Sequence, residues 1–337
     1  MSASPNTDAS AAGGTATASP SPERVWVSQA TGGLGARVVR LLAASDRAHP
    51  VDVDACTTMV WLDAHDADAR ASRRESALVG LSTTLAANPQ VTHLVLVSSA
   101  MVYGAYANNP VPLTEDTALR PDVEFAYARQ LGAVEQLVDD WRRTVEGRTV
   151  TVLRPAIAMA ADGTSGIASA LAAGMGQRMG EADPPAQFLH LDDLASAVVL
   201  SVERRLDGVF NVSPDGWIQG ERVRALAGAV PRMKFPERVS EVITNLRWRF
   251  QRGPIPPGLR GYTRSPWLVA NDRLRAEGWQ PTVTNEQAYV EGTEAKWWTM
   301  VSPKRRQELA LGGMVSVIVV VSVMVTRGVV HARRRRH

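Results

Sequence analysis

The sequence predicts an α/β fold, with an open, doubly wound parallel sheet and helices on both of its faces. Three apolar runs of strand length, at 57–62, 91–97 and 149–155, are rich in β-branched residues, as strands buried on both faces are. Longer segments of helical length separate them. Glycines follow the strand-like segment 24–28, and two serines follow the run at 91–97. In sheets of this kind, ligands bind at the carboxyl ends of the strands.

Residues 1–23 differ in composition from the rest of the chain. They are rich in Ser, Ala, Thr, Pro and Gly and contain almost no large apolar side chain. Such a segment cannot bury enough apolar surface to offset its loss of conformational entropy, so we expect a disordered N-terminal tail. The segment also lacks the basic start and the apolar run of a signal peptide.

The globular part of the chain is predicted to span 24–302 and to begin with a strand, a glycine-rich turn and a helix. The turn contains Gln29, Gly32 and Gly35, and the helix is expected over 36–44. A helix that starts directly after such a turn presents unpaired backbone N–H groups to an anion. A single glycine-rich turn is by itself a weak predictor of a nucleotide site.

A hydroxyl-bearing turn and a tyrosine-bearing helix follow in the middle of the chain. Ser99 stands at the end of a predicted strand, and Tyr127 lies on a helix predicted over about 121–143. Leu131 follows Tyr127 by four residues, so both side chains lie on the same face of that helix.

These segments, in this order, resemble the extended short-chain dehydrogenase/reductase superfamily, and within it the NAD-dependent epimerase/dehydratase group. The resemblance extends from Arg24 to about Gln280. Its pieces are the strand followed by SSAMVYG, the tyrosine helix, Leu153-Arg154-Pro155, FLHLDDLA at 188–195 and GVFNV at 208–212. Each piece is short, and their order and spacing together predict a Rossmann-like sheet with a small C-terminal substrate lobe.

The resemblance implies that Ser99 and Tyr127 occupy the positions of a serine that assists a tyrosine general acid/base. In that family a lysine four residues after the tyrosine lowers its pKa and holds the nicotinamide ribose. Here that residue is Leu131. Without a nearby cation a phenol keeps a pKa of about 10, far above the pH at which it would act as a general base. Arg129 lies about 200° around the helix from Tyr127 and should face elsewhere.

The cofactor site implied by the resemblance is also altered. Gly32 and Gly35 match the second and third glycines of the Gly-x-x-Gly-x-x-Gly fingerprint, but Gln29 replaces the first, which makes the tight turn beside the pyrophosphate. We expect the glutamine to crowd the phosphate or to force a different turn. Arg154 and Pro155 complete the residues that the resemblance assigns to the cofactor, which would be NAD or NADP.

A deletion follows the glycine-rich turn. Thr57 begins the next predicted central strand only 22 residues after Gly35, about half the spacing of relatives. The missing part would contain the second strand and the acidic residue that holds the adenosine ribose. Asp52 and Asp54 could replace that residue, but they are more typical of a solvated turn. We therefore expect a sheet that lacks one or two edge strands and an open or absent adenine pocket.

Composition excludes several classes of function. Cys56 is the single cysteine, so no intramolecular disulfide can form. The six histidines are scattered, and the ligand-rich segment 63–68 is more typical of a capped, solvated loop than of a metal site, so no metal is predicted. The net charge is +3, but residues from Pro303 onward hold eight basic residues and one acidic residue. The rest of the chain holds 29 basic and 33 acidic residues, which argues against a nucleic-acid partner.

The C-terminal end predicts a membrane anchor. Residues 309–326 form an uncharged apolar run that would span about 27 Å as a helix. A basic segment, 303–308, precedes this run, and a basic tail, 327–337, follows it. We expect a single-pass transmembrane helix in the cell membrane. The family resemblance and the lack of a signal peptide place the main domain in the cytoplasm.

Three further elements are expected in the second half of the domain. Asp192 or Asp193 is predicted to cap a helix that runs to Arg205. The segment 231–261 resembles the region that covers the substrate in relatives, and a short final helix is expected over 273–278.

Three functions fit these observations. Gln29, the deletion and Leu131 all affect one functional unit. This favours a catalytically degenerate, membrane-anchored protein that binds a nucleotide or nucleotide-sugar, or acts as a scaffold. The alternative is an active NAD(P)-dependent oxidoreductase or sugar-nucleotide epimerase that uses Ser99 and Tyr127, with a cation supplied from elsewhere in the fold. The third is a pure interaction module whose pocket is closed by side chains such as Gln29 and Leu131.

Overall fold

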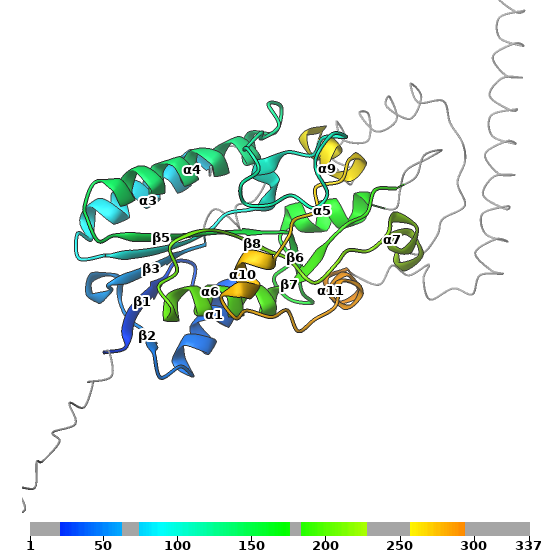
Figure 1. Ribbon diagram of the computed structural model, residues 1–337. Coiled ribbons are helices and arrows are strands. Elements are labelled where there is room, and N and C mark those ends of the chain that lie inside the picture. Colours follow the sequence, from blue (N-terminus) through cyan, green and yellow to red (C-terminus); the bar gives the residue numbers. More distant parts are fainter. Residues whose placement is uncertain (1–20, 63–73, 176–182, 228–256, 294–337) are drawn as a thin grey trace, which may run out of the picture.

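A six-stranded parallel sheet forms the centre of the protein (Figure 1). The computed structural model describes residues 21–62, 74–175, 183–227 and 257–293. The strand order is β2-β1-β3-β4-β5-β8. The strands are β1 (Glu23–Val27), β2 (Ala48–Pro50), β3 (Thr58–Trp61), β4 (His93–Val97), β5 (Thr149–Pro155) and β8 (Gly208–Val212). Every pair of neighbours is parallel, which confirms the predicted α/β sheet.

Helices cover both faces of this sheet (Figure 1). One face carries α1 (Gly33–Ala43) and α6 (Leu191–Glu203), which lie against each other. The opposite face carries α3 (Arg74–Ala87) and α4 (Ala126–Arg143). The sheet therefore lies between two helical layers, as a doubly wound fold requires.

Strand β4 shows how the sequence produces this arrangement. All of its residues are buried. Leu94 and Leu96 belong to the core cluster beneath α3 and α4, whereas Val95 and Val97 belong to the cluster beneath α1 and α6. Because side chains alternate between the faces of a strand, a strand covered on both faces needs an apolar residue at every position.

A smaller lobe lies beyond the carboxyl end of β5. Two short parallel strands, β6 (Ile157–Met159) and β7 (Phe188–His190), form its sheet. The other elements of this half of the chain are α5 (Gly166–Gly174), α7 (Gly220–Leu226), η4 (Pro257–Leu259), α9 (Arg260–Arg264), α10 (Asp272–Ala276) and α11 (Asn285–Gly292). Helix α10 is the short helix that was expected over 273–278.

A strand follows α1 despite the shortened sequence, so the expectation that the second strand is missing was wrong. Strand β2 has three residues and ends opposite Val25, two residues before the end of β1. The chain then crosses directly to β3 through the short 3-10 helix η1 (Val53–Ala55). Among the described residues no strand pairs with the outer edge of β2, and the lack of an edge strand on this side stays a prediction.

Helix α4 begins at Ala126, several residues later than the sequence suggested. The Asp122 carboxylate accepts the backbone N–H of Glu124, and the Phe125 N–H donates to the Asp122 carbonyl. These bonds hold residues 122–125 in a turn, and local bonds from Asp side chains compete with helix formation in this way.

The predicted cap of α6 was also wrong. The N-cap is His190, whose side chain accepts the Asp192 N–H, and neither aspartate caps the helix. The Asp192 carboxylate pairs with Arg37 of α1. The buried Asp193 carboxylate instead accepts the N–H groups of Thr282 and Val283, so it fastens the segment before α11. Both side chains are used in tertiary contacts, which sequence spacing does not reveal.

Several predicted segments lie outside the described residues. They are most of the N-terminal tail 1–23, the ligand-rich segment 63–68, most of the segment 231–261, and all residues from 294 onward, which include the apolar run 309–326. Within the described ranges, no helix has both the length and the apolar character needed to cross a membrane.

Candidate functional site

The glycine-rich turn between β1 and α1 keeps the conformation of a glycine turn although its first glycine is replaced. Gln29 has a φ of 51°, in the left-handed region that glycine adopts at no steric cost. Its side chain is exposed, so it does not fill the interior, and whether it crowds a bound phosphate stays a prediction. A Cβ on Gly35 would lie 2.1 Å from the Gln29 carbonyl oxygen. Gly35 is therefore required for the close approach of α1 to the turn.

The N-terminus of α1 opens into a polar depression of about 570 Å³. Gly32 is the N-cap residue and provides no side-chain cap for the first-turn N–H groups. The depression is lined by the turn 31–33, by Ala36, Arg37 and Arg40 of α1, and by Asp162, Gly163 and Asp192. Backbone N–H groups at a helix N-terminus, with arginines beside them, favour an anionic group.

A loop after β6 is fastened across the first turn of α1 by Arg37. The Arg37 guanidinium binds the carboxylate of Asp162 and, at 2.6 Å, that of Asp192. These contacts hold the pKa of the Asp162 carboxyl below its usual value. Gly163 lies against Gly33, where a Cβ would come within 2.5 Å of the Gly163 Cα. Two glycines thus allow the loop to touch the glycine-rich turn.

Ser99, Tyr127 and Leu131 are all buried, with exposed fractions of 8%, 4% and 3%. The Ser99 hydroxyl accepts the Met101 N–H and caps the 3-10 helix η3 (Ala100–Tyr103), which contacts α4. Tyr127 and Leu131 both belong to the apolar core on that side of the sheet. The 3-10 turn that Ser99 caps therefore contacts the helix that carries Tyr127, and the three side chains are buried, with an aliphatic one at the position where the resemblance implies a lysine.

Arg154, which the resemblance assigned to the cofactor, is part of a buried polar network. Its guanidinium binds the Glu135 carboxylate at 2.6 Å and the Tyr103 hydroxyl at 2.8 Å. The Ser98 hydroxyl donates to the same carboxylate, and the Tyr103 hydroxyl donates to Asn211. Burial raises the pKa of Tyr103 above its usual value, although the adjacent Arg154 guanidinium opposes this effect. The described contacts give Arg154 a structural role, and Pro155 is buried at the end of β5.

The sequence analysis missed Glu135, the partner of Arg154. Glu135 is 7% exposed and lies four residues after Leu131, on the buried face of α4. A carboxylate on an apolar helical face is costly to bury unless a cation neutralises it. That signal was present in the spacing of the sequence.

The two aspartates that could replace the ribose-binding acid lie at the surface. Asp52 and Asp54 are exposed on the turn between β2 and β3, as predicted for solvated turn residues.

Within the described ranges, no group of three or more His, Cys, Asp or Glu side chains could hold a metal ion.

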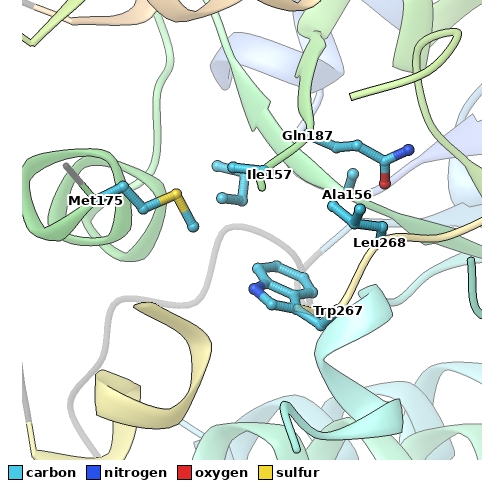
Figure 2. Close-up of a pocket in the computed structure, with 7 residues that line it drawn as sticks. Ala156, Ile157, Met175, Gln187, Trp267 and Leu268 are labelled. Atoms are coloured by element: carbon cyan, nitrogen blue, oxygen red, sulfur yellow. The ribbon is translucent and has the colours of Figure 1, made fainter. Parts of the chain in front are cut away.

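A cavity of about 10 Å³ remains in the smaller lobe, between Ile157, Met175 and Trp267 (Figure 2). A volume of this size holds one water molecule at most. Gln187 lines the cavity, but its amide is already used: it donates to Gly216 and Val269 and accepts the Val269 N–H. The cavity therefore offers neither the volume nor the polar groups that bind a sugar.

Comparison with known proteins agrees with this architecture. Residues 77–213 match the sequence profile of the NAD dependent epimerase/dehydratase family. An uncharacterized protein of Mycobacterium tuberculosis strain H37Rv is 26% identical over 204 residues, which cover 60% of this chain and 54% of that relative. An uncharacterized protein of Mycobacterium bovis matches to the same extent. The chain thus spans about half the length of the curated relatives it matches.

Solved structures with the same fold include one complexed with NADPH and one complexed with NAD. RMD from Pseudomonas aeruginosa, complexed with NADPH, is similar with a TM-score of 0.57 and 21% identity, over 80% of this chain and 97% of that one. UDP-glucose 4-epimerase from Thermus thermophilus, in complex with NAD, has a TM-score of 0.56 and 16% identity over the same shares. UDP-glucose 4-epimerase from Thermotoga maritima with UDP-glucose has a TM-score of 0.56 and 15% identity, again over the same shares. At these identities the likeness shows the fold.

Proposed function

We propose that the chain, whose residues 77–213 match the NAD dependent epimerase/dehydratase family, is a membrane-anchored NAD(P)-binding protein that does not perform the tyrosine–lysine proton transfer. One observation carries the proposal: Leu131, at the lysine position, is 3% exposed and belongs to the apolar core. An aliphatic side chain can neither lower the pKa of a phenol nor donate a hydrogen bond to a ribose.

Two arginines of the described residues, Arg154 and Arg129, do not replace that lysine. Arg154 is buried and neutralised by Glu135, and Arg129 is exposed on another face of α4. A phenol with an ordinary pKa of about 10 is ionised in roughly one molecule per thousand at pH 7. Leu131 carries no charge that could lower the pKa of a tyrosine beside it, as a lysine would.

The phosphate end of a dinucleotide fits the chain better than the nicotinamide end does. The left-handed turn at Gln29 and the uncapped N-terminus of α1 suit a diphosphate, because backbone N–H groups point into the open depression. The charges of Arg37 and Arg40 there are offset by Asp162 and Asp192. By contrast, Ser99 and Tyr127 are closed off from solvent. Relatives in complex with NADPH, with NAD and with UDP-glucose support NAD(P) and a nucleotide-sugar as the ligand classes to test.

We expect NADH and NADPH to bind the full chain with micromolar or weaker affinity, measured by calorimetry in detergent. Thr31→Glu should weaken binding at least about tenfold, because it places a carboxylate in the depression beside the phosphate site. Gln136→Glu adds the same charge to an exposed position of α4 and should leave binding unchanged. The purified chain should not convert UDP-glucose when supplied with NAD or NADP.

Two results would contradict the proposal. Turnover that disappears in Tyr127→Phe would show that the site is catalytic. Absence of NAD(P) binding, both in the native chain and in the Gln29→Gly, Leu131→Lys double variant, would show that the nucleotide pocket is gone. The search for function should then turn to protein partners at the membrane.

The membrane anchor is the second half of the proposal and rests on the uncharged run 309–326. We expect the full chain to stay with membranes after alkaline carbonate extraction. Ile318→Arg together with Val320→Arg should release it, because each arginine at the centre of a span costs about 2.5–3.5 kcal/mol on insertion scales. Arg334→Ala, in the basic tail, is the control that should remain in the pellet. Release of the native chain would refute the anchor.

A further inference from the structure

A short segment of the C-terminal half lies against two elements: the turn η3, which Ser99 caps, and the start of helix α4, which carries Tyr127. It consists of residues 257–268, which contain η4, α9 and Trp267, and we call it the aromatic cover. In Figure 1 α9 lies beside α5, on the side of the molecule that holds the smaller lobe. Leu259 and Tyr262 of the cover have no exposed surface, and Trp267 is 7% exposed.

The cover contacts the start of the tyrosine helix through Phe125. This ring precedes Tyr127 by two residues, and its centroid lies 5.7 Å from those of Tyr127 and Tyr262. Gly258 lies directly on Phe125, where a Cβ would come within 2.6 Å of the ring. A larger residue at position 258 would push the cover away from Phe125.

The cover contacts the serine turn through the hydroxyl of Tyr262. That hydroxyl donates to the Met101 carbonyl oxygen at 2.7 Å, and the N–H of Met101 is the group that Ser99 accepts. Burial raises the pKa of Tyr262, so the hydroxyl keeps its proton and remains a donor. One side chain of the cover is therefore bonded to the turn that positions Ser99.

Trp267 extends the cover into the small cavity of Figure 2. Its indole N–H donates to the Tyr262 carbonyl, and the two rings meet edge to face at 5.3 Å. Beyond Trp267 the chain is fixed, because the Leu113 N–H donates to Leu268 and the Ala270 N–H donates to Leu113. The space left beside the indole is about 10 Å³, whereas pockets for drug-sized ligands need several hundred.

We propose that the aromatic cover, residues 257–268, closes the approach to Ser99 and Tyr127, so that a small molecule reaches them only when the cover is displaced. This inference concerns the site of the proposed function but does not depend on nucleotide binding. Displacement requires the loss of several contacts, among them the hydrogen bonds from Tyr262 to Met101, from Asn109 to Pro266 and from Leu113 to Leu268, and the packing on Phe125. Local opening of this kind occurs without global unfolding in many proteins.

The test uses a cysteine as a reporter in the full chain. Ser99→Cys is made together with Cys56→Ala, and its reaction with a small disulfide reagent is compared with that of Thr31→Cys, which is exposed. We expect the cysteine at position 99 to react at least about a hundred times more slowly. Tyr262→Phe should speed its reaction about fivefold, because it removes one hydrogen bond and keeps the ring. Gly258→Ala should speed it further.

Tyr289→Phe is the matched control, since Tyr289 is a buried tyrosine of α11, outside the cover, whose ring meets that of Phe188 edge to face. It should leave the rate unchanged. Hydrogen exchange supplies a second measurement: amides of 259–264 should exchange faster than those of β4, and faster still in Tyr262→Phe. The proposal is overturned if the cysteine at position 99 reacts as fast as the one at position 31, or equally slowly in every variant. It is also overturned if 259–264 and β4 exchange at the same rate.

Discussion

Replacement of Glu135 by alanine is expected to lower the free energy of unfolding by about 3–5 kcal/mol. The Glu135 carboxylate and the Arg154 guanidinium are 7% and 5% exposed and lie 2.6 Å apart. Removal of the carboxylate would leave an arginine buried with an uncompensated charge, and it would also remove the acceptor of the Ser98 hydroxyl. Urea unfolding of the detergent-solubilised chain, followed by circular dichroism, measures the change.

Asp139→Ala is the control for this prediction. Asp139 lies on the same helix, one turn after Glu135, and pairs with Arg142 and Arg143 at partly exposed positions. Exposed pairs of this kind contribute about 0–1 kcal/mol, so the control should change stability little. Equal effects of the two substitutions would mean that Arg154 finds another partner or that water reaches it.

Acidification is expected to destabilise the protein through His93, at the amino end of β4. Burial, and the charge of Arg205, lower the pKa of His93 from 6.5 to about 4, against the opposing effect of Glu23. The ring faces Thr149, whose hydroxyl lies 2.7 Å from Nδ1. The folded state therefore binds a proton less readily than the unfolded state. The stabilisation is complete above about pH 6.5 and is lost as the pH falls towards about 4.

Between about pH 7.5 and pH 5 this group should remove about 2 kcal/mol of stability. Glu23 acts below this interval: burial raises its pKa, but Arg205 and Thr58 lower it more, so its stabilisation is lost only as the pH falls below about 4.5. The contribution of His93 is isolated by comparison with His93→Gln, whose stability should fall less over the same interval. Parallel pH profiles for the two proteins, from urea unfolding, would contradict the assignment.

The sheet was predictable from the sequence because strands buried on both faces are continuous apolar runs. The bounds of β5 and β8 are those of the predicted segments 149–155 and 208–212. The start of α4 was less predictable, since the carboxylate of Asp122 holds the preceding residues in a turn. The short strand β2 was missed because three residues carry no periodicity and are defined only by pairing with β1.

The site was predictable only in the identity of its residues. The sequence showed that a leucine stands at position 131, and a family resemblance predicted the roles of Ser99 and Tyr127. It did not show that Arg154 is neutralised by Glu135, because an ion pair depends on which helix face meets which strand.

By itself, the sequence determined the class of fold and the loss of the lysine, because both are written in residue types at short spacings. Tertiary structure alone decided whether the site is accessible. One hydrogen bond of the aromatic cover, for example, joins Tyr262 to Met101, which is 161 residues away in the chain. No local pattern encodes such a contact, since burial arises from the packing of segments that meet only after the chain has folded.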